Sequence, residues 1–202
     1  TKDNPMGETD EVMSFLPLCH VFEQLFTVYG QLTHGYTVNF IESLDTVTDN
    51  MREISPTVGY AVPRIWEKYL SAVYIRMSDA TWFKKLVFGL ALEIGKRRAT
   101  LRMNFKHVPF HIEGLYQLAY FAVFRKLKER LGFDRMRMAY SGAAPISPDV
   151  LHFFQSIGVN LMEGYGQTEG TGVTCVSRAG RVKFGTVGPP LSGTEVKIAE
   201  DG

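Results

Sequence analysis

Short apolar runs alternate with amphipathic helical patterns along most of this chain, and this alternation constrains its fold more than any other feature. Pro63 opens one of the helices, at a position where a helix needs no N–H donor. A repeat of strand and helix is typical of an α/β fold with a layered parallel sheet. In the first 80 residues we expect strands at 12–20, 36–41 and 57–62 and helices at 21–32, 44–54 and 63–77.

The helix at 21–32 has apolar side chains at spacings that place them on one stripe, as on a face turned toward a core. The stripe consists of Val21, Leu25, Val28 and Leu32. Ser43 is expected to cap the following helix, which ends before Pro56.

The second half continues the pattern, and Gly132 is expected just past the end of a strong helix. A helix should also begin at Ser147-Pro148-Asp149. The tail, with Pro189-Pro190, is typical of antiparallel β structure. The elements expected here are helices at 81–102, 115–132 and 149–158 and strands at 135–140 and 159–166.

Two small-residue loops follow consecutive predicted strands. The first is "SGAAP", residues 141–145, and the second lies within "EGYGQTEGTG", residues 163–172. In open α/β sheets ligands bind beyond the carboxyl ends of strands, so we expect both loops to flank one crevice. The second loop nearly matches the dinucleotide fingerprint G-x-G-x-x-G, but Glu169 stands where the third glycine belongs.

A nucleotide explains both loops together. Gly142, Ala143 and Ala144 would let a flat ring lie against backbone, and Tyr165 would stack on it. Thr168 offers a hydroxyl to a phosphate oxygen, and Glu169 suits Mg²⁺, which often joins a carboxylate to substrate phosphates. Each loop alone is more often a simple turn. Their occurrence on consecutive elements favours nucleotide binding.

Charge and cysteine content narrow the range of partners. The formal net charge of +1 gives no global field for nucleic acid, so we expect none to bind. Residues 84–137 nevertheless hold thirteen Lys/Arg against four Asp/Glu, which suggests either a solvated basic face or contact with anionic lipid or a phosphorylated ligand. Cys19 and Cys175 show no disulfide or metal spacing, and we expect both to be buried thiols in a reducing compartment. No apolar run is long enough for a transmembrane helix.

Together the motifs resemble the AMP-forming adenylating enzymes, which include acyl-CoA synthetases, luciferases and the adenylation domains of peptide synthetases. "GYGQTE" preceded by "SGAAP" carries the likeness, and "LPLCHVFEQ" resembles the family's histidine-bearing segment. "VPRIWEK" resembles the long-chain fatty acyl-CoA synthetases, and "TVGPPLSGTEVKI" resembles the family's next segment. The likeness spans nearly the whole chain.

The resemblance implies a two-step reaction. A fatty acid carboxylate attacks the α-phosphorus of Mg·ATP to give acyl-adenylate and pyrophosphate, and coenzyme A then displaces AMP. Long-chain fatty acid, ATP and coenzyme A would be the substrates, with Mg²⁺ as cofactor. The implied nucleotide-binding residues are Gly142, Ala143, Ala144, Glu163, Gly164, Tyr165, Gly166 and Thr168, the implied catalytic residues are His20, Thr168 and Glu169, and the implied metal ligand is Glu169.

Two further positions bear on the acyl substrate. Long-chain members place the acyl tunnel beside the helix after the histidine, and some bacterial members have a gating tryptophan where this chain has Gln24. Trp66 either supports that tunnel or belongs to the core, as an aromatic residue in an amphipathic helix usually does.

The resemblance also sets the expected domain organisation. Residues 1–176 would form part of an α/β nucleotide- and acyl-binding core, and 177–202 the start of a β subdomain. The family's phosphate loop, ribose-binding Asp and catalytic Lys have no match here, so we expect a fragment that is inactive alone. Three interpretations stay open. The chain is part of a cytoplasmic long-chain fatty-acid–CoA ligase, with or without peripheral membrane contact; part of an adenylating relative that loads an acyl carrier; or a non-catalytic nucleotide- or lipid-binding module.

Overall fold

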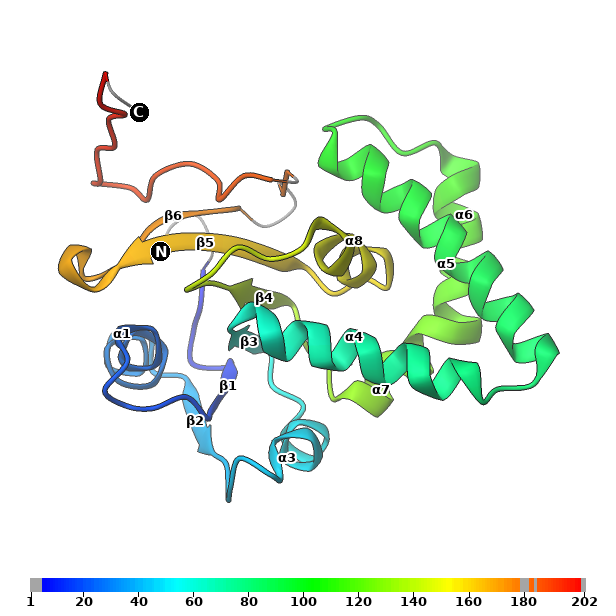
Figure 1. Cartoon of the computed structure of the whole chain (residues 1–202), viewed down its shortest axis with the longest axis horizontal. Helices are drawn as coiled ribbons and strands as arrows, with labels where there is room; N and C mark the ends of the chain where they lie inside the picture. Colours follow the sequence, from blue (N-terminus) through cyan, green and yellow to red (C-terminus); the bar gives the residue numbers. More distant parts are fainter. Residues whose placement is uncertain (1–4, 179–181, 184, 201–202) are drawn as a thin grey trace.

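The strands of this computed structural model form two sheets, with helices arranged around them (Figure 1). The structure describes residues 5–178, 182–183 and 185–200. The smaller sheet pairs two strands in parallel, and the larger has the order β3-β4-β5-β6, parallel except for the last pair. The expected α/β fold with a parallel sheet is confirmed. The strands are β1 (Glu11–Ser14), β2 (Thr37–Phe40), β3 (Val58–Ala61), β4 (Met138–Ser141), β5 (Leu161–Gln167) and β6 (Gly172–Val176).

The helices largely follow the expected pattern. Pro63 occupies the first turn of its helix, and Gly132 caps another with a left-handed φ of 74°. Ser43 does not cap: the helix begins at Val47 with Thr46 at its N-cap, and Ser43 belongs to the preceding turn. The helices after β2 are α3 (Val47–Ile54), α4 (Pro63–Ser78), α5 (Trp82–Met103), α6 (Phe110–Ala119), the π-helical η2 (Tyr120–Phe124), α7 (Arg125–Leu131) and α8 (Pro148–Ser156).

The first helix differs from expectation in the face that it buries. It runs through α1 (Val21–Gln24), the π-helical η1 (Leu25–Gly30) and α2 (Gln31–His34). Val28 and Leu32 of the predicted stripe are 39% and 75% exposed. The neighbouring face is buried instead, because its aromatic side chains pack on the rings of the sheet; it carries Phe22, Glu23, Phe26 and Thr27.

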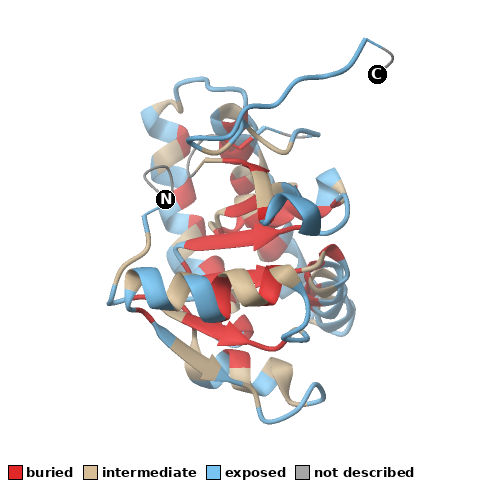
Figure 2. Cartoon of the chain, turned by 90° about the vertical axis from the view of Figure 1, so that its left-hand side faces the viewer, coloured by how far each residue is buried: buried red, intermediate tan, exposed pale blue. Residues whose placement is uncertain are grey.

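The core lies along the strands and on the helix faces turned toward them, as the red segments of Figure 2 show. Trp66 is 2% exposed, and its ring lies 5.9 Å from that of Phe133 and 5.3 Å from that of Phe154. It is therefore a core residue. Cys175 is buried as expected, but Cys19 is exposed in the turn before α1, and both are free thiols. Among the described helices, none is both long and apolar enough to cross a bilayer.

The glycine-rich segment lies within a β-hairpin instead of following a strand as a loop. β5 runs through Gly164 and Gly166 and pairs antiparallel with β6, with a bulge between Tyr165 and Gly166. A Cβ on Gly166 would lie only 1.7 Å from the carbonyl oxygen of Gly172, so the two backbones approach too closely for any side chain. The hairpin itself therefore requires this glycine.

The tail after β6 returns alongside the hairpin. Cys175 forms an antiparallel bridge with Pro190, and Leu191 N–H donates to the carbonyl of Thr174 at 3.0 Å. These contacts agree with antiparallel β structure at that point. The division into domains at residue 176 stays a prediction.

An ion pair between the buried Asp10 and the partly exposed Arg137 joins the start of β1 to the start of β4. The carboxylate of Asp10 accepts hydrogen bonds from Arg137 Nε at 2.8 Å, Thr57 Oγ1 at 2.8 Å and Gly7 N–H at 3.0 Å. Burial by itself raises the pKa of Asp10, but the hydrogen bonds from Arg137, Thr57 and Gly7 bring it below the usual 3.8. The folded state thus favours the charged carboxylate.

Acid should weaken the fold through this pair. Because the pKa of Asp10 is lower in the folded state, its contribution is present above the unfolded value of 3.8 and is lost as pH falls through the lowered value. Asp10→Asn should reduce the free energy of unfolding at neutral pH by roughly 2 kcal/mol and flatten the acid dependence. Urea denaturation across pH measures both. Asp49→Asn, which removes an exposed pair with Arg52, is the control and should change little; equal losses in the two variants would contradict the role of the pair between Asp10 and Arg137.

The hairpin predicts different effects on stability for alanine substitutions at two glycines of β5. Gly166→Ala should lower the free energy of unfolding by roughly 3 kcal/mol, because its Cβ collides with fixed backbone. Gly164→Ala should be tolerated, since the nearest atom to its Cβ would be 3.5 Å away, an ordinary contact. Thermal denaturation of both variants tests this. Similar melting temperatures for the two would show that the hairpin does not need the close approach.

Candidate functional site

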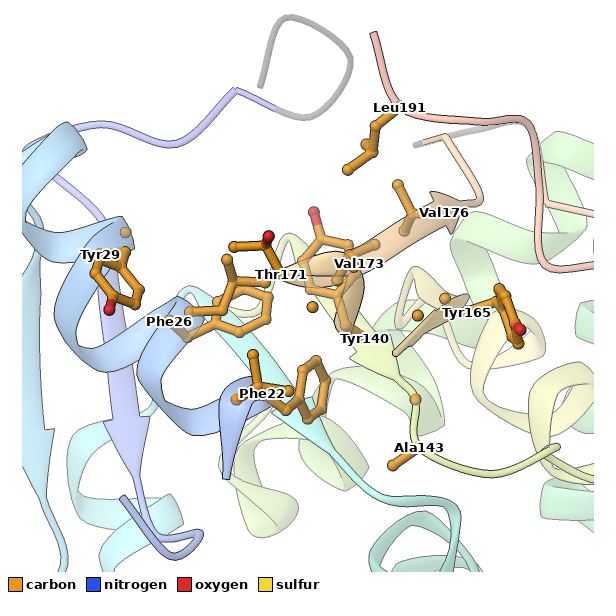
Figure 3. Close-up of a pocket in the computed structure, with 18 of the residues that line it drawn as sticks. Phe22, Phe26, Tyr29, Tyr140, Ala143, Tyr165, Thr171, Val173, Val176 and Leu191 are labelled. Carbon is orange, nitrogen blue, oxygen red and sulfur yellow. The ribbon is translucent and has the colours of Figure 1, made fainter. Parts of the chain in front are cut away.

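A cavity of about 670 Å³ lies between the first helix, the carboxyl end of β4 and the β5–β6 hairpin. Figure 3 shows its wall, with Phe22 and Phe26 on one side and Tyr140 and Val173 near the centre. Segments more than 100 residues apart in the chain thus meet at one site.

Most of the site residues expected from the sequence line this cavity. Ala144 and Glu163 do not. The chemical roles of all of them stay predictions. Those brought together are His20, Gly142, Ala143, Gly164, Tyr165, Gly166, Thr168 and Glu169.

The two predicted loops meet because their strands are neighbours. β4 and β5 are parallel and pair Ser141 with Glu163, so the turn after β4 lies beside the part of β5 that continues into the hairpin with β6. Ala143 then adopts a left-handed φ of 68°, which is uncommon for a residue with a Cβ. The crevice expected from the strand order is therefore present.

Glu163 lies behind the crevice and not in its wall. It is 7% exposed, and its Oε1 accepts a hydrogen bond from Ile146 N–H at 3.4 Å. Burial raises the pKa of this carboxyl, and the Ile146 hydrogen bond opposes the shift. In this position Glu163 supports the segment that follows "SGAAP".

His20 is the N-cap of α1. Its Nδ1 accepts a hydrogen bond from Phe22 N–H at 3.1 Å, while the residue is exposed and lines the cavity. Because Nδ1 acts as the acceptor, the neutral imidazole carries its proton on Nε2. The cap therefore fixes a tautomer whose free nitrogen is a hydrogen-bond donor.

The aromatic wall of the cavity was not anticipated from the sequence. The Phe26 ring stacks on Tyr60 with centroids 4.4 Å apart, and Phe22 meets Phe26 edge to face at 5.5 Å. Tyr140, at 5.5 Å from Phe26, completes the group. The signal available was the F-x-x-x-F spacing beside the predicted stripe, which places both rings on one helix face.

Glu23 is the second residue that sequence reasoning missed. It is fully buried, and its carboxylate accepts hydrogen bonds from Leu16 N–H at 3.1 Å, Thr27 Oγ1 at 2.6 Å and Tyr60 OH at 2.9 Å. Burial is the main cause that raises the pKa of Tyr60; the hydrogen bond with Thr27 opposes this shift and the Glu23 carboxylate adds to it, so the hydroxyl stays protonated as a donor. This network holds the first helix against β3.

Glu169 lies in the short turn η3 (Thr168–Gly170) between β5 and β6, exposed on the cavity side that it lines. Within the described part of the chain, no three His, Cys, Asp or Glu residues gather to form a metal cage. One carboxylate beside the Thr168 hydroxyl suits Mg²⁺ instead, because Mg²⁺ often takes one or two protein carboxylates and completes its shell with substrate phosphates and water.

The described lining of the cavity carries negative charge and no lysine or arginine. Among the described residues that line it, none is Lys or Arg, and the charged group is the carboxylate of Glu169. The lining therefore offers rings, backbone and hydroxyls to a ligand, but no fixed positive charge to a triphosphate.

Sequence comparison identifies relatives over almost the whole chain. The family model described as AMP-binding enzyme matches residues 1–202. A putative fatty-acid–CoA ligase, fadD11, from Mycobacterium tuberculosis (strain ATCC 25618 / H37Rv) is 34% identical over 194 residues, covering 96% of this chain and 34% of that protein. The long-chain-fatty-acid–CoA ligase ACSBG2 of Xenopus laevis is 30% identical over 190 residues, covering 93% and 25%. The chain thus spans between a quarter and about a third of these relatives.

Solved structures share the fold. A benzoate CoA ligase from Burkholderia xenovorans LB400 superposes with a TM-score of 0.56 at 19% identity, covering 93% of this chain and 28% of that one. The N-terminal domain of FACL13 from Mycobacterium tuberculosis gives 0.52 at 18% identity, covering 88% and 32%. Because the family model matches the full length, this chain belongs to the AMP-binding enzyme family.

Proposed function

We propose that this chain is the central part of an AMP-forming long-chain fatty-acid–CoA ligase. The observation that carries the proposal is the meeting of "SGAAP", "GYGQTE" and His20 around one cavity with an aromatic and aliphatic wall. The relatives named as fatty-acid–CoA ligases, at 34% and 30% identity, support the same reaction class.

The nucleotide would lie where the end of β4 meets the β5–β6 hairpin. Gly142 and Gly164 leave space beside the backbone, and Tyr165, which is 47% exposed, offers a ring face to adenine. The left-handed backbone at Ala143 turns the chain around this position. Thr168 would donate its hydroxyl to the α-phosphate.

In the first step a carboxylate oxygen of the fatty acid attacks the α-phosphorus of ATP, and the bond to the pyrophosphate oxygen breaks. Negative charge develops on the α-phosphoryl oxygens, and donors already in place stabilise it. His20 would supply one such donor through Nε2–H. Glu169 would hold Mg²⁺, which neutralises phosphate charge when bound. In the second step the thiol sulfur of coenzyme A attacks the acyl carbon, and AMP leaves.

The acyl chain would lie beside the first helix. Phe22, Leu25 and Phe26 face the cavity there, and Val173 of β6 closes it from the hairpin side (Figure 3). An apolar wall of this kind stabilises a hydrocarbon chain through burial. Gln24 is not part of the wall; its side-chain amide donates to the Leu18 carbonyl at 2.9 Å and holds the preceding turn.

The 202 residues alone would not complete this reaction. Among the described residues, no lysine or arginine lines the cavity, so this part of the chain offers no cation to the β- and γ-phosphates. In the whole enzyme those groups would come from other segments.

Glu169→Gln in the full-length protein should lower the rate of ATP–pyrophosphate exchange with a long-chain fatty acid by about a hundredfold at limiting Mg²⁺, because it removes the charged metal ligand. Raising Mg²⁺ should recover part of the loss. Glu67→Gln, on the exposed face of α4, is the matched control and should leave the rate unchanged.

Wild-type exchange rates for Glu169→Gln at limiting Mg²⁺ would refute the metal role. The same assay on the 202-residue chain should show no exchange; measurable exchange would refute its dependence on other segments. A panel of carboxylates, with coenzyme A and acyl carrier protein as acceptors, tests the substrate assignment, and preference for the carrier protein would favour a carrier-loading enzyme.

We also propose that the protein is cytoplasmic and touches membranes peripherally through the start of α5. Trp82, Phe83 and Leu86 are 76%, 60% and 51% exposed there, with Lys84 and Lys85 between them. Aromatic side chains partition into the membrane interface, and lysines beside them are attracted to anionic headgroups.

Vesicle co-sedimentation tests this contact. The chain should pellet with vesicles that contain phosphatidylserine, less so at high salt, and the double variant Lys84→Gln/Lys85→Gln should reduce the bound fraction several-fold. Arg64→Gln/Lys68→Gln, on the exposed face of α4, removes the same charge elsewhere and is the control. Equal losses of vesicle binding in the two double variants, or no binding by the wild-type chain, would contradict the proposed contact.

A further inference from the structure

A second cavity, of about 430 Å³, is lined mainly by residues of the helices α5 to α8. Figure 1 shows that α5 and α6 lie on the far side of the molecule from α1. The cavity wall comes from α5, from α6 and η2, from α7, from the end of α8 and the turn after it, and from Val182 of the tail. The volume is in the range of small-molecule sites. None of the residues of the nucleotide site takes part in it.

The wall of this cavity is cationic. Arg98, Arg102 and Lys128 line it, and no carboxylate does so among the described residues. The nearest acid, Glu113, is already engaged: its two oxygens accept from Arg98 Nε at 2.8 Å and Arg98 Nη2 at 2.9 Å. Arg102 lies 4.0 Å from the same carboxylate, too far for a hydrogen bond. One acid is thus shared by two guanidinium groups.

Lys128 adds a buried positive charge to this excess of cations over carboxylates. The residue is 6% exposed, and its Nζ donates to the Gly158 carbonyl at 3.4 Å, a long bond for an ammonium that has three donors. Burial lowers the pKa of Lys128, and the charge of Asp134, an exposed residue, opposes the shift. A buried ammonium with this little compensation costs free energy unless an anion approaches.

The lowered pKa of Arg102 also indicates an excess of positive charge in this wall. Burial, followed by the like charge of Arg98, lowers the pKa of Arg102, while Glu113 raises it. Positive charges therefore repel one another across this wall in the absence of a ligand.

The rest of the wall suits a polar ligand. The Tyr116 ring lies under the Arg98 guanidinium, 3.9 Å from its carbon to the centroid, and the Tyr120 ring lies 5.9 Å from Lys128 Nζ. These rings hold the cations in place. The amide of Asn160 adds a neutral donor to the wall. The amides of Gln117 and Gln155 line it too, but they already donate to Glu113 at 3.3 Å and to the Leu161 carbonyl at 2.8 Å.

We propose that this cavity binds a small phosphate-bearing anion, with Arg102 and Lys128 as its charge partners. A structural role explains Arg98, whose guanidinium joins α5 to α6 through Glu113. It does not explain the exposed Arg102 or the spare donors of Lys128. Phosphate is the fitting chemistry because several cations converge with neutral donors, the arrangement that charge-assisted phosphate binding uses. The site is independent of the proposed ligase activity.

Calorimetric titration of the chain with inorganic pyrophosphate, in the absence of Mg²⁺, tests the site. Arg102→Gln should weaken binding by about tenfold and Lys128→Met by at least as much, since each removes one charge-assisted partner. Lys126→Gln, an exposed lysine two positions away, removes the same charge outside the cavity and should change the affinity less than about twofold. Glu169→Gln should leave it unchanged, which separates this site from the nucleotide cavity.

Three outcomes would overturn the proposal: no pyrophosphate binding by the wild-type chain, no effect of Arg102→Gln, or an equal effect of Lys126→Gln. Arg102 has a side chain that is 54% exposed, so its variant keeps the test valid if Lys128→Met does not fold. Competition by a nucleoside monophosphate or by a soluble short-chain phosphatidate then identifies the source of the phosphate, and either result supports the site.

Discussion

The buried carboxylate of Glu23 is the interaction on which the site depends. Three hydrogen bonds from a backbone N–H, a threonine and a tyrosine fix it, and they join the turn before α1, the helix itself and β3. An acid at 0% exposure is stable only with such partners. Because the helix is held at this point, His20 at its cap and Phe22 in its first turn face the crevice between the end of β4 and the β5–β6 hairpin.

The two glycines of β5 across the cavity from this helix, Gly164 and Gly166, differ in why the structure has a glycine there. Gly166 is required by the close approach of two backbones in the hairpin, whether or not a ligand is present. Gly164 has space around it, so only its position at the cavity suggests a ligand. The hairpin also explains the departure from the dinucleotide fingerprint: Glu169 lies on the turn between the strands, where its carboxylate reaches the cavity.

The features predicted correctly from the sequence are those that depend on local sequence rules and on the order of the strands. Alternation gave the α/β class, Pro63 and Gly132 marked helix ends, and the order of the motifs placed two turns at one sheet edge. The predictions were wrong where contacts between residues far apart in the chain determine which side chains are buried. The helix stripe was wrong because Phe22 and Phe26 pack on rings from β3 and β4, and the burial of Glu23 depends on Tyr60, 37 positions away. The resemblance implied that Glu163 lies near the nucleotide; the structure places it behind the cavity wall, and its role stays a prediction.

The π-helical turn at Leu25–Gly30 has a consequence for how this family can diversify. A π turn holds one residue more than an α turn, and one residue corresponds to about 100° of rotation about a helix axis. Losing a single residue there would swing Tyr29 and the side chains after it around the axis, while Phe22 and the cap stay in place. Insertion or deletion within this turn would thus rotate the later side chains and reshape the cavity near Tyr29, while its end near His20 would keep its shape.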